Sequence, residues 1–221
     1  MTDLSIVSHI CVGRAVPYRD DEQSAFAKTP VAGPVAIRAL GIEGDQQADL
    51  KHHGGPHMAV HHYPHDHHAF WRTQIGDHEV LKLPGAFGSN LSVTGLSETD
   101  VKLGDRFKLG SAVLELSQPR MPCWKIEHRF QRKAMVAKII KTGKSGWYYR
   151  VIEEGTAVAG DTLERISTDA SDWTVERILL AIANPKTAVE IDELEAMAAN
   201  VLLGPSWRDG ARQKINFLNS L

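Results

Sequence analysis

The sequence predicts a mixed α/β fold that is mainly β: a β-barrel with peripheral helices, followed by a small C-terminal segment of three helices. Short runs of alternating apolar and polar residues, separated by glycine- and proline-rich turns, recur through the first 168 residues. The dipeptide Gly-Asp returns between these runs, which is typical of a barrel with similar corners. After residue 168 the apolar residues take a helical period. We therefore expect a barrel domain over residues 1–168 and a helical segment over residues 173–221.

Composition and charge exclude several classes of protein. The 221 residues suffice for one large domain with a core, or one domain with a small appendage. A formal net charge of −2 argues against a dedicated nucleic-acid binder. Two distant cysteines, Cys11 and Cys123, do not form a disulfide framework, so we expect a reducing, cytoplasmic compartment. The first residues lack a leader pattern, and no apolar window approaches the length of a membrane span.

The first strands follow from alternation and turn residues. Residues 4–12 alternate well enough for an edge or barrel strand, and residues 14–34 are rich in proline, glycine and charge, which predicts a loop or hairpin. Residues 35–40 predict a second strand, which ends in a turn over residues 41–45.

A dense group of histidines comes next. Residues 51–68 contain eight of the eleven histidines, but their order does not match a zinc-protease helix and no cysteine pair accompanies them. Residues 58–63 predict a strand on which His61 and His62 face opposite ways. Pro64 suits the first turn of a helix running to about Gly76, and the histidines on it are expected to face solvent: His65, His67 and His68.

The loop before that strand has a different character. Lys51, His52 and His53 are followed by Gly54-Gly55-Pro56, and a plain connection does not need two glycines and a proline. Glycines let the backbone approach a ligand closely, and the lysine and histidines offer hydrogen-bond donors. This loop therefore predicts an anion-binding site.

The middle of the chain predicts further strands and one helix. A small-residue loop ends at Asn90, which either holds the turn or contacts a ligand, and residues 91–94 form a strand. Asp105 and Asp161 follow glycines and have ordinary turn chemistry before their strands. Residues 129–141 carry an apolar stripe that predicts a single helix stopped by Gly143. The last strands are expected over residues 146–152 and 161–166.

Three helical patterns close the sequence. Val175, Ile178 and Leu179 lie on one apolar face that ends at Pro185. Thr187 begins a capping-box pattern for the second helix, and Ser206 is the expected cap of the third. None of these helices carries a catalytic pattern, so packing, partner binding or formation of a homodimer is their expected role.

The strongest chemical signal is residues 117–125, Ser-Gln-Pro-Arg-Met-Pro-Cys-Trp-Lys. The strand predicted over residues 112–116 cannot simply continue, because Pro119 and Pro122 stiffen the chain, and we expect a rigid bend rather than a helix. Cys123 lies between Arg120 and Lys125, and nearby positive charge favours the thiolate form that attacks or binds metal. The alternative is an inert, buried cysteine beside a tryptophan.

Four motifs together resemble the MOSC domain, the β-rich domain named for the C-terminal part of molybdenum-cofactor sulfurases. They are Lys51-His-His-Gly-Gly-Pro, Phe87-Gly-Ser-Asn-Leu91, Leu103-Gly-Asp105 and Ser117-Gln-Pro-Arg-x-Pro-Cys123-x-Lys125. The stretch over residues 142–147 and the trailing helices are similar to the bacterial YiiM-like branch. The resemblance covers nearly the whole chain. The chain departs from the family pattern in two places: His57-Met58 replaces Asp-Arg, and Ser89 replaces Glu.

The resemblance implies a MOSC-type barrel that binds the molybdenum cofactor and reduces N-hydroxylated compounds, chiefly base analogues such as 6-hydroxylaminopurine. Carried over position by position, Cys123 is the catalytic residue and the protein ligand to molybdenum. The residues implied to line the pterin and its phosphate are Lys51, His52, His53, Asn90, Arg120 and Lys125. Pyridoxal phosphate binding is a second property associated with the domain.

The source of electrons must lie outside this chain if it is a reductase. The sequence has no dinucleotide-binding glycine motif, no flavin motif and no cysteine set for an iron–sulfur cluster. Residues 120–150 carry nine lysines and arginines against a single acid, Glu127. This strip is either a solvated helix face or a docking surface for an acidic flavoprotein-type donor. Two other functions stay open: a sulfur carrier with a persulfide on Cys123, and a hydrolytic zinc protein built on the histidine loop.

Overall fold

The computed structural model describes residues 4–19, 22–49, 53–168 and 171–220. Within these ranges, seven strands close a barrel in the order β13-β9-β10-β11-β7-β8-β1, and β1 pairs with β13 to complete it. Neighbouring strands are antiparallel except for β7 and β8, which are parallel. The barrel strands are β1 (Leu4–Val12), β7 (Val60–Pro64), β8 (Leu91–Val93), β9 (Arg106–Leu109), β10 (Ala112–Pro119), β11 (Trp147–Glu153) and β13 (Thr162–Ser167). The predicted mainly-β barrel is therefore confirmed.

In the described part of the chain, shorter strands and two 3-10 helices flank the barrel. The hairpin predicted within residues 14–34 is present and pairs β2 with β3, while β12, which the sequence analysis missed, pairs with β5. These elements are β2 (Val16–Arg19), β3 (Glu22–Ser24), β4 (Thr29–Pro30), β5 (Val35–Arg38), β6 (Gly41–Ile42), β12 (Gly155–Ala157), η1 (Pro56–Met58) and η2 (Glu79–Lys82).

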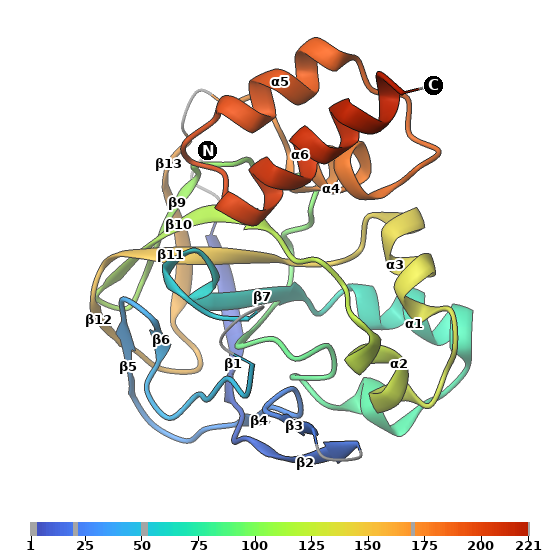
Figure 1. Ribbon diagram of the computed structural model, residues 1–221. Coiled ribbons are helices and arrows are strands. Elements are labelled where there is room, and N and C mark those ends of the chain that lie inside the picture. The colour runs from blue at the N-terminus through green and yellow to red at the C-terminus, as the bar shows by residue number, and fades with distance from the viewer. Residues whose placement is uncertain (1–3, 20–21, 50–52, 169–170, 221) are drawn as a thin grey trace.

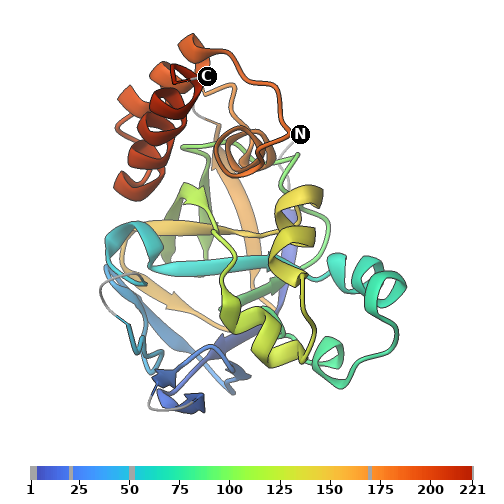
Figure 2. The ribbon, with the colours of Figure 1, turned by 45° about the vertical axis from the view of Figure 1, so that its right-hand side comes forward.

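The helices form two groups around the barrel. Figure 1 shows α4–α6 gathered at one end of the barrel and α1–α3 along its side, and the turned view in Figure 2 agrees. Their bounds are α1 (His67–Ile75), α2 (Trp124–Phe130), α3 (Met135–Thr142), α4 (Val175–Ala183), α5 (Ile191–Ala199) and α6 (Pro205–Leu218). In the part of the chain that the structure describes, no helix has the length and apolarity needed to cross a membrane.

Two hydrophobic clusters of described residues hold the barrel and the helices together. The larger one joins the barrel interior, for example Leu114 and Leu116, to Ile178 and Leu179 of α4 and Trp207 of α6. The smaller one packs α1, α2 and α3 around a core that contains Trp71, Phe87 and Phe130. The C-terminal helices thus bury their apolar faces against the barrel. The division into segments 1–168 and 173–221 stays a prediction.

Several helix boundaries differ from those predicted. Pro64 ends β7, and α1 begins only at His67. The single helix expected over residues 129–141 is two helices, because Gln131 and Ala134 adopt positive φ angles of 46° and 63° between them. Such backbone angles in residues other than glycine give no pattern in the sequence, so the break was not predictable from composition. The C-cap at Gly143 is confirmed.

Two of the expected helix caps are also wrong. The N-cap of α5 is Glu190, without a side-chain capping bond, rather than Thr187. The N-cap of α6 is Gly204, and Pro205 takes the first helical position, so Ser206 already lies inside the helix. In α4, by contrast, the Thr174 hydroxyl accepts a hydrogen bond from the Arg177 amide at 3.1 Å.

Candidate functional site

One cleft collects most of the residues that the sequence predicted to be functional. It occupies about 640 Å³, including its open mouth, beside strand β7 and the segment that follows β10. The predicted residues that line the cleft are His53, Asn90, Arg120, Cys123 and Lys125. Lys51 and His52 lie outside the described residues.

The backbone after β10 presents the Cys123 thiol at this cleft. Strand β10 runs to Pro119, and Cys123 then has an extended backbone with φ −128° and ψ 168°. Its side chain is half-buried rather than enclosed. The expectation that no helix follows was wrong, because α2 begins at Trp124 directly after the thiol. Proline restricts itself and the residue before it, whereas the residues after Pro122 are free to enter a helix.

Two buried cations flank the thiol in the sequence and line the same cleft. Arg120 is 4% exposed and Lys125 is 7% exposed, and among the described residues neither forms an ion pair with a carboxylate. The Arg120 guanidinium lies 5.7 Å from the centre of the Phe26 ring. Burial of a charge without a counterion is costly. An anionic ligand in the cleft would supply the missing negative charge.

A third buried cation was missed by the sequence analysis. Lys28 lines the cleft and forms an ion pair with Asp45, whose carboxylate also accepts the Gly13 amide at 2.7 Å. Burial lowers the pKa of Lys28, and the contact with Asp45 opposes that effect. The available signal was Asp45 itself, which follows Gly44 in a Gly-Asp pair that, unlike the pairs at Asp105 and Asp161, precedes no strand.

Asn90 acts as a structural connection at the base of the cleft. Its side-chain oxygen accepts the His61 amide at 3.0 Å, and its side-chain nitrogen donates to the Cys11 carbonyl at 3.1 Å and to Asp45 at 2.9 Å. These contacts occupy both ends of the amide. Of the two roles left open by the sequence, the structure therefore favours holding the chain over direct ligand binding.

Two residues of the glycine-rich loop, His53 and Gly54, line the cleft, and the loop's anion-binding role stays a prediction. His53 is half-buried, and its backbone amide donates to the Asp49 carbonyl at 2.9 Å. Gly54 has a φ of +98°, and an added Cβ would lie 2.2 Å from the Gln47 side-chain oxygen. Any larger residue at this position would be strained by the positive φ angle.

His61 lines the cleft, and one of its ring nitrogens is a hydrogen-bond acceptor without a donor among the described residues. Its Nδ1 lies 3.1 Å from the Gly88 carbonyl, which can only accept, so Nδ1 carries the hydrogen and Nε2 holds a lone pair. Burial, together with the charge of Arg120, lowers the pKa of His61 well below its usual value. Nε2 is buried and has no hydrogen-bond partner among the described residues.

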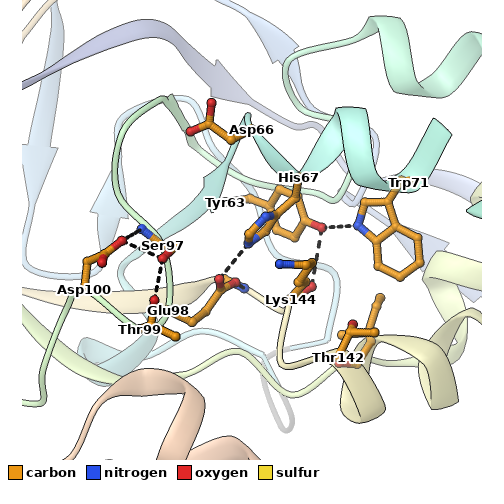
Figure 3. Close-up of polar contacts among 12 residues, drawn as sticks. Tyr63, Asp66, His67, Trp71, Ser97, Glu98, Thr99, Asp100, Thr142 and Lys144 are labelled. Carbon is orange, nitrogen blue, oxygen red and sulfur yellow. Dashed lines mark hydrogen bonds and ion pairs between the residues drawn. The ribbon is translucent and has the colours of Figure 1, made fainter. Parts of the chain in front are cut away.

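The histidines of α1 are buried, which corrects the expectation that they face solvent. His67 is 5% exposed and its Nε2 lies 2.6 Å from the Glu98 carboxylate, as Figure 3 shows. His68 is 1% exposed and its Nδ1 lies 2.9 Å from the Leu81 carbonyl, and burial lowers its pKa to about 4. His65 is half-buried. Glu98 and the Leu81 carbonyl make this burial possible, and the apolar pattern of a helix does not indicate such distant partners.

The zinc alternative finds no support in the geometry. Within the described ranges, no group of three or more histidine, cysteine, aspartate or glutamate side chains is arranged to hold a metal ion. His62 faces away from His61 and stacks on Trp147 with ring centres 4.0 Å apart. Burial lowers the pKa of His62 to about 3. Among the described histidines, His62, His67 and His68 thus contribute to packing and hydrogen bonding.

Comparison with known proteins identifies the family. Residues 49–164 match the MOSC domain. Protein YiiM of Escherichia coli is 40% identical over 76% of this chain and 74% of its own length. A protein named "Reductase" from Gibberella moniliformis is 39% identical over 69% of this chain but only 27% of its own length. The crystal structure of YiiM from Geobacillus stearothermophilus superposes with a TM-score of 0.80 at 28% identity, covering 96% of this chain and 99% of that one. The chain therefore belongs to the MOSC domain family, in its YiiM-like branch.

Proposed function

We propose that this protein binds the molybdenum cofactor in the Cys123 cleft and reduces N-hydroxylated compounds, with base analogues such as 6-hydroxylaminopurine as the substrate class. The observation that carries the proposal is a half-buried thiol that lines one cleft together with two buried cations, Arg120 and Lys125, which have no carboxylate partner among the described residues. Membership of the MOSC family and the relative named "Reductase" support a redox function. The two free cysteines fit the reducing environment of the cytoplasm.

The donor set of the cleft fits this cofactor. Thiolate sulfur is a soft ligand and suits a metal that already carries sulfur ligands. Arg120 and Lys125 suit the phosphate of the pterin, because both offer charged N–H donors. The unpartnered Nε2 of His61 suits an N–H donor such as those on a pterin ring. The cleft thus offers a metal ligand, anion contacts and a hydrogen-bond acceptor within one volume.

In this proposal each residue has a defined task. The bound cofactor would supply a two-electron centre able to remove oxygen from an N–OH group. The overall reaction breaks the N–O bond, takes up two electrons and two protons, and releases the amine and water. Cys123 holds the metal, while Arg120 and Lys125 fix the anionic end of the cofactor. Tyr148 also lines the cleft.

Electrons would come from a separate flavoprotein-type donor. Most of the "Reductase" relative lies outside the region shared with this chain, which is consistent with redox parts carried elsewhere in that protein. Two residues of the predicted basic strip have partners within the chain. Arg129 donates a hydrogen bond to the Ala86 carbonyl, and Arg150 forms an ion pair with Glu115. The exposed remainder, which we call the basic face, consists of Arg132, Lys133, Lys138 and Lys141 on and before α3. Its charge would attract an acidic partner.

Salt dependence tests both the reaction and the docking surface. Protein from a host that makes the cofactor should reduce 6-hydroxylaminopurine, whereas protein from a host that cannot make it should be inactive. Reduction driven by a protein donor should slow steeply as salt rises, because salt screens charge over about 8 Å at physiological ionic strength. Reduction driven by a small neutral chemical donor should change little. Initial rates measured over a series of salt concentrations provide the comparison.

Charge reversal provides the matched control. The double variant Arg132→Glu and Lys133→Glu should slow only the reaction with the protein donor. Reversal of two exposed lysines on other elements, Lys108→Glu and Lys186→Glu, should leave both reactions nearly unchanged. Equal salt dependence with both donors would show that the donor docks elsewhere.

A sulfur carrier is the second candidate function. The half-exposure of Cys123 favours it, because a persulfide carrier must present its sulfur to a partner. The two candidates differ in what Cys123 holds: a metal in one case, and an extra sulfur atom in the other.

A further inference from the structure

Glu98 lies behind the cleft and links two segments that the cleft needs. It is 3% exposed and does not line the cleft. One carboxylate oxygen accepts the Gly146 amide at 2.7 Å, and the other lies 2.6 Å from Nε2 of His67. Figure 3 shows His67 reaching from α1 toward Glu98, with Tyr63 and Trp71 in contact beside them. Both oxygens of a buried carboxylate are therefore satisfied.

Residues 145–146, which Glu98 binds through the Gly146 amide, also bind the backbone of Arg120. The Arg120 amide donates to the Gly146 carbonyl at 3.0 Å, and the Ser145 hydroxyl donates to the Arg120 carbonyl. Both backbone polar groups of Arg120 thus bind residues 145–146. Gly146 is tightly seated, since an added Cβ would lie 2.3 Å from the His62 carbonyl oxygen. A shift of Gly146 would therefore move the backbone of Arg120.

We infer that Glu98 is a positioning residue that sets the place of Arg120 in the cleft through Gly146. The inference rests on the proposed function, in which Arg120 binds the anionic end of the ligand. Loss of the carboxylate would leave the buried Gly146 amide without an acceptor, and the segment would move to regain one. A guanidinium binds a phosphate through two parallel hydrogen bonds, so a small displacement of Arg120 weakens that contact.

Binding of inorganic phosphate to the cofactor-free full-length protein measures this effect without any catalysis. Glu98→Ala should weaken phosphate binding by about tenfold in isothermal titration calorimetry, the change expected from loss of one charged contact. Glu98→Gln should restore most of the affinity, because its side-chain oxygen can still accept the Gly146 amide. Rescue by glutamine distinguishes positioning from a need for negative charge at residue 98.

Asp105 provides a matched control. It is a fully buried carboxylate whose Oδ2 accepts the Lys102 amide at 2.9 Å and pairs with Arg165 at 3.3 Å, while its Oδ1 has no hydrogen-bond partner among the described residues. It does not line the cleft. Asp105→Ala should cost stability to a similar degree but leave phosphate affinity within about twofold. Equal weakening in both alanine variants would overturn the inference and indicate general loosening.

Amide hydrogen exchange gives a second, local readout. In Glu98→Ala the amides of Gly146 and Arg120 should exchange faster, whereas in Asp105→Ala they should not. Ser145→Ala removes one of the two contacts to Arg120, so it tests the same link if Glu98→Ala fails to fold. Folded Glu98→Ala or Ser145→Ala protein with wild-type phosphate affinity and wild-type exchange at Arg120 would overturn the inference.

The variant Arg120→Ala separates the inference from the function on which it rests. If Arg120→Ala binds phosphate as the wild type does, the proposed anion contact is wrong. Exchange at the Arg120 amide in the Glu98 variants still decides whether Glu98 positions this backbone. If Arg120→Ala loses phosphate binding and Glu98→Ala does not, the function stands and the positioning role fails.

Discussion

Replacement of Cys123 by serine is expected to abolish reduction of N-hydroxylated bases, with a loss of about two orders of magnitude or more in kcat. A hydroxyl is a harder and less easily ionised ligand than a thiol, so it cannot replace thiolate at a soft metal. The fold should survive, because Cys123 is the N-cap of α2 and serine is a favoured N-cap residue. Steady-state kinetics and a thermal melt of the same sample check both statements.

The matched control is Cys11→Ser. Cys11 is fully buried, and burial raises the pKa of its thiol to about 11, so it stays neutral and inaccessible. A hydroxyl at this buried position costs stability, by about 1 kcal/mol, but activity per folded molecule should stay within about twofold. Full activity in Cys123→Ser, or equal losses in the two variants, would remove Cys123 from the reaction.

Loss of the Arg120 guanidinium is expected to release the cofactor. A charged hydrogen-bonded contact contributes about 1.5–3 kcal/mol, so Arg120→Ala should weaken cofactor binding by about tenfold or more. Arg120→Lys keeps the charge but loses the planar fork, and its molybdenum content should lie between those of the alanine variant and the wild type. Molybdenum per protein chain, measured before and after a desalting column, gives the result.

Arg129 serves as the control for that experiment. It lies on α2 near Arg120 in sequence, but its Nε donates to the Ala86 carbonyl at 3.0 Å and it does not line the cleft. Arg129→Lys should retain wild-type molybdenum content. If Arg120→Ala also retains it through the column, the anionic end of the cofactor binds elsewhere.

Local patterns predicted the elements whose structure depends on neighbours in sequence. The alternation over residues 4–12 and the Gly-Asp corners at Asp105 and Asp161 gave strands in the right places. Burial of His67 and His68 was not predictable, because Glu98 and the Leu81 carbonyl, which make it tolerable, come from distant segments.

In the candidate site, too, the residues that lie close together in sequence were predictable and the contacts between distant segments were not. Arg120, Cys123 and Lys125 lie within six residues of one another, so their common position at the cleft follows from one bend. The ion pair of Lys28 with Asp45 joins residues from separate loops, and only the folded chain brings them together. Helix α2 was missed directly after Cys123 because the proline argument reaches only as far as Pro122 itself.

The most direct test of the central claim is what the purified protein carries when its host can make the molybdenum cofactor. Metal analysis by mass spectrometry, release of the pterin and the intact mass of the chain answer this in one sample. The proposal predicts stoichiometric molybdenum, a releasable pterin and an unmodified Cys123 after the cofactor is removed. A metal-free chain with one extra sulfur atom on Cys123 would contradict it in favour of a sulfur carrier, and stoichiometric zinc without pterin would contradict both.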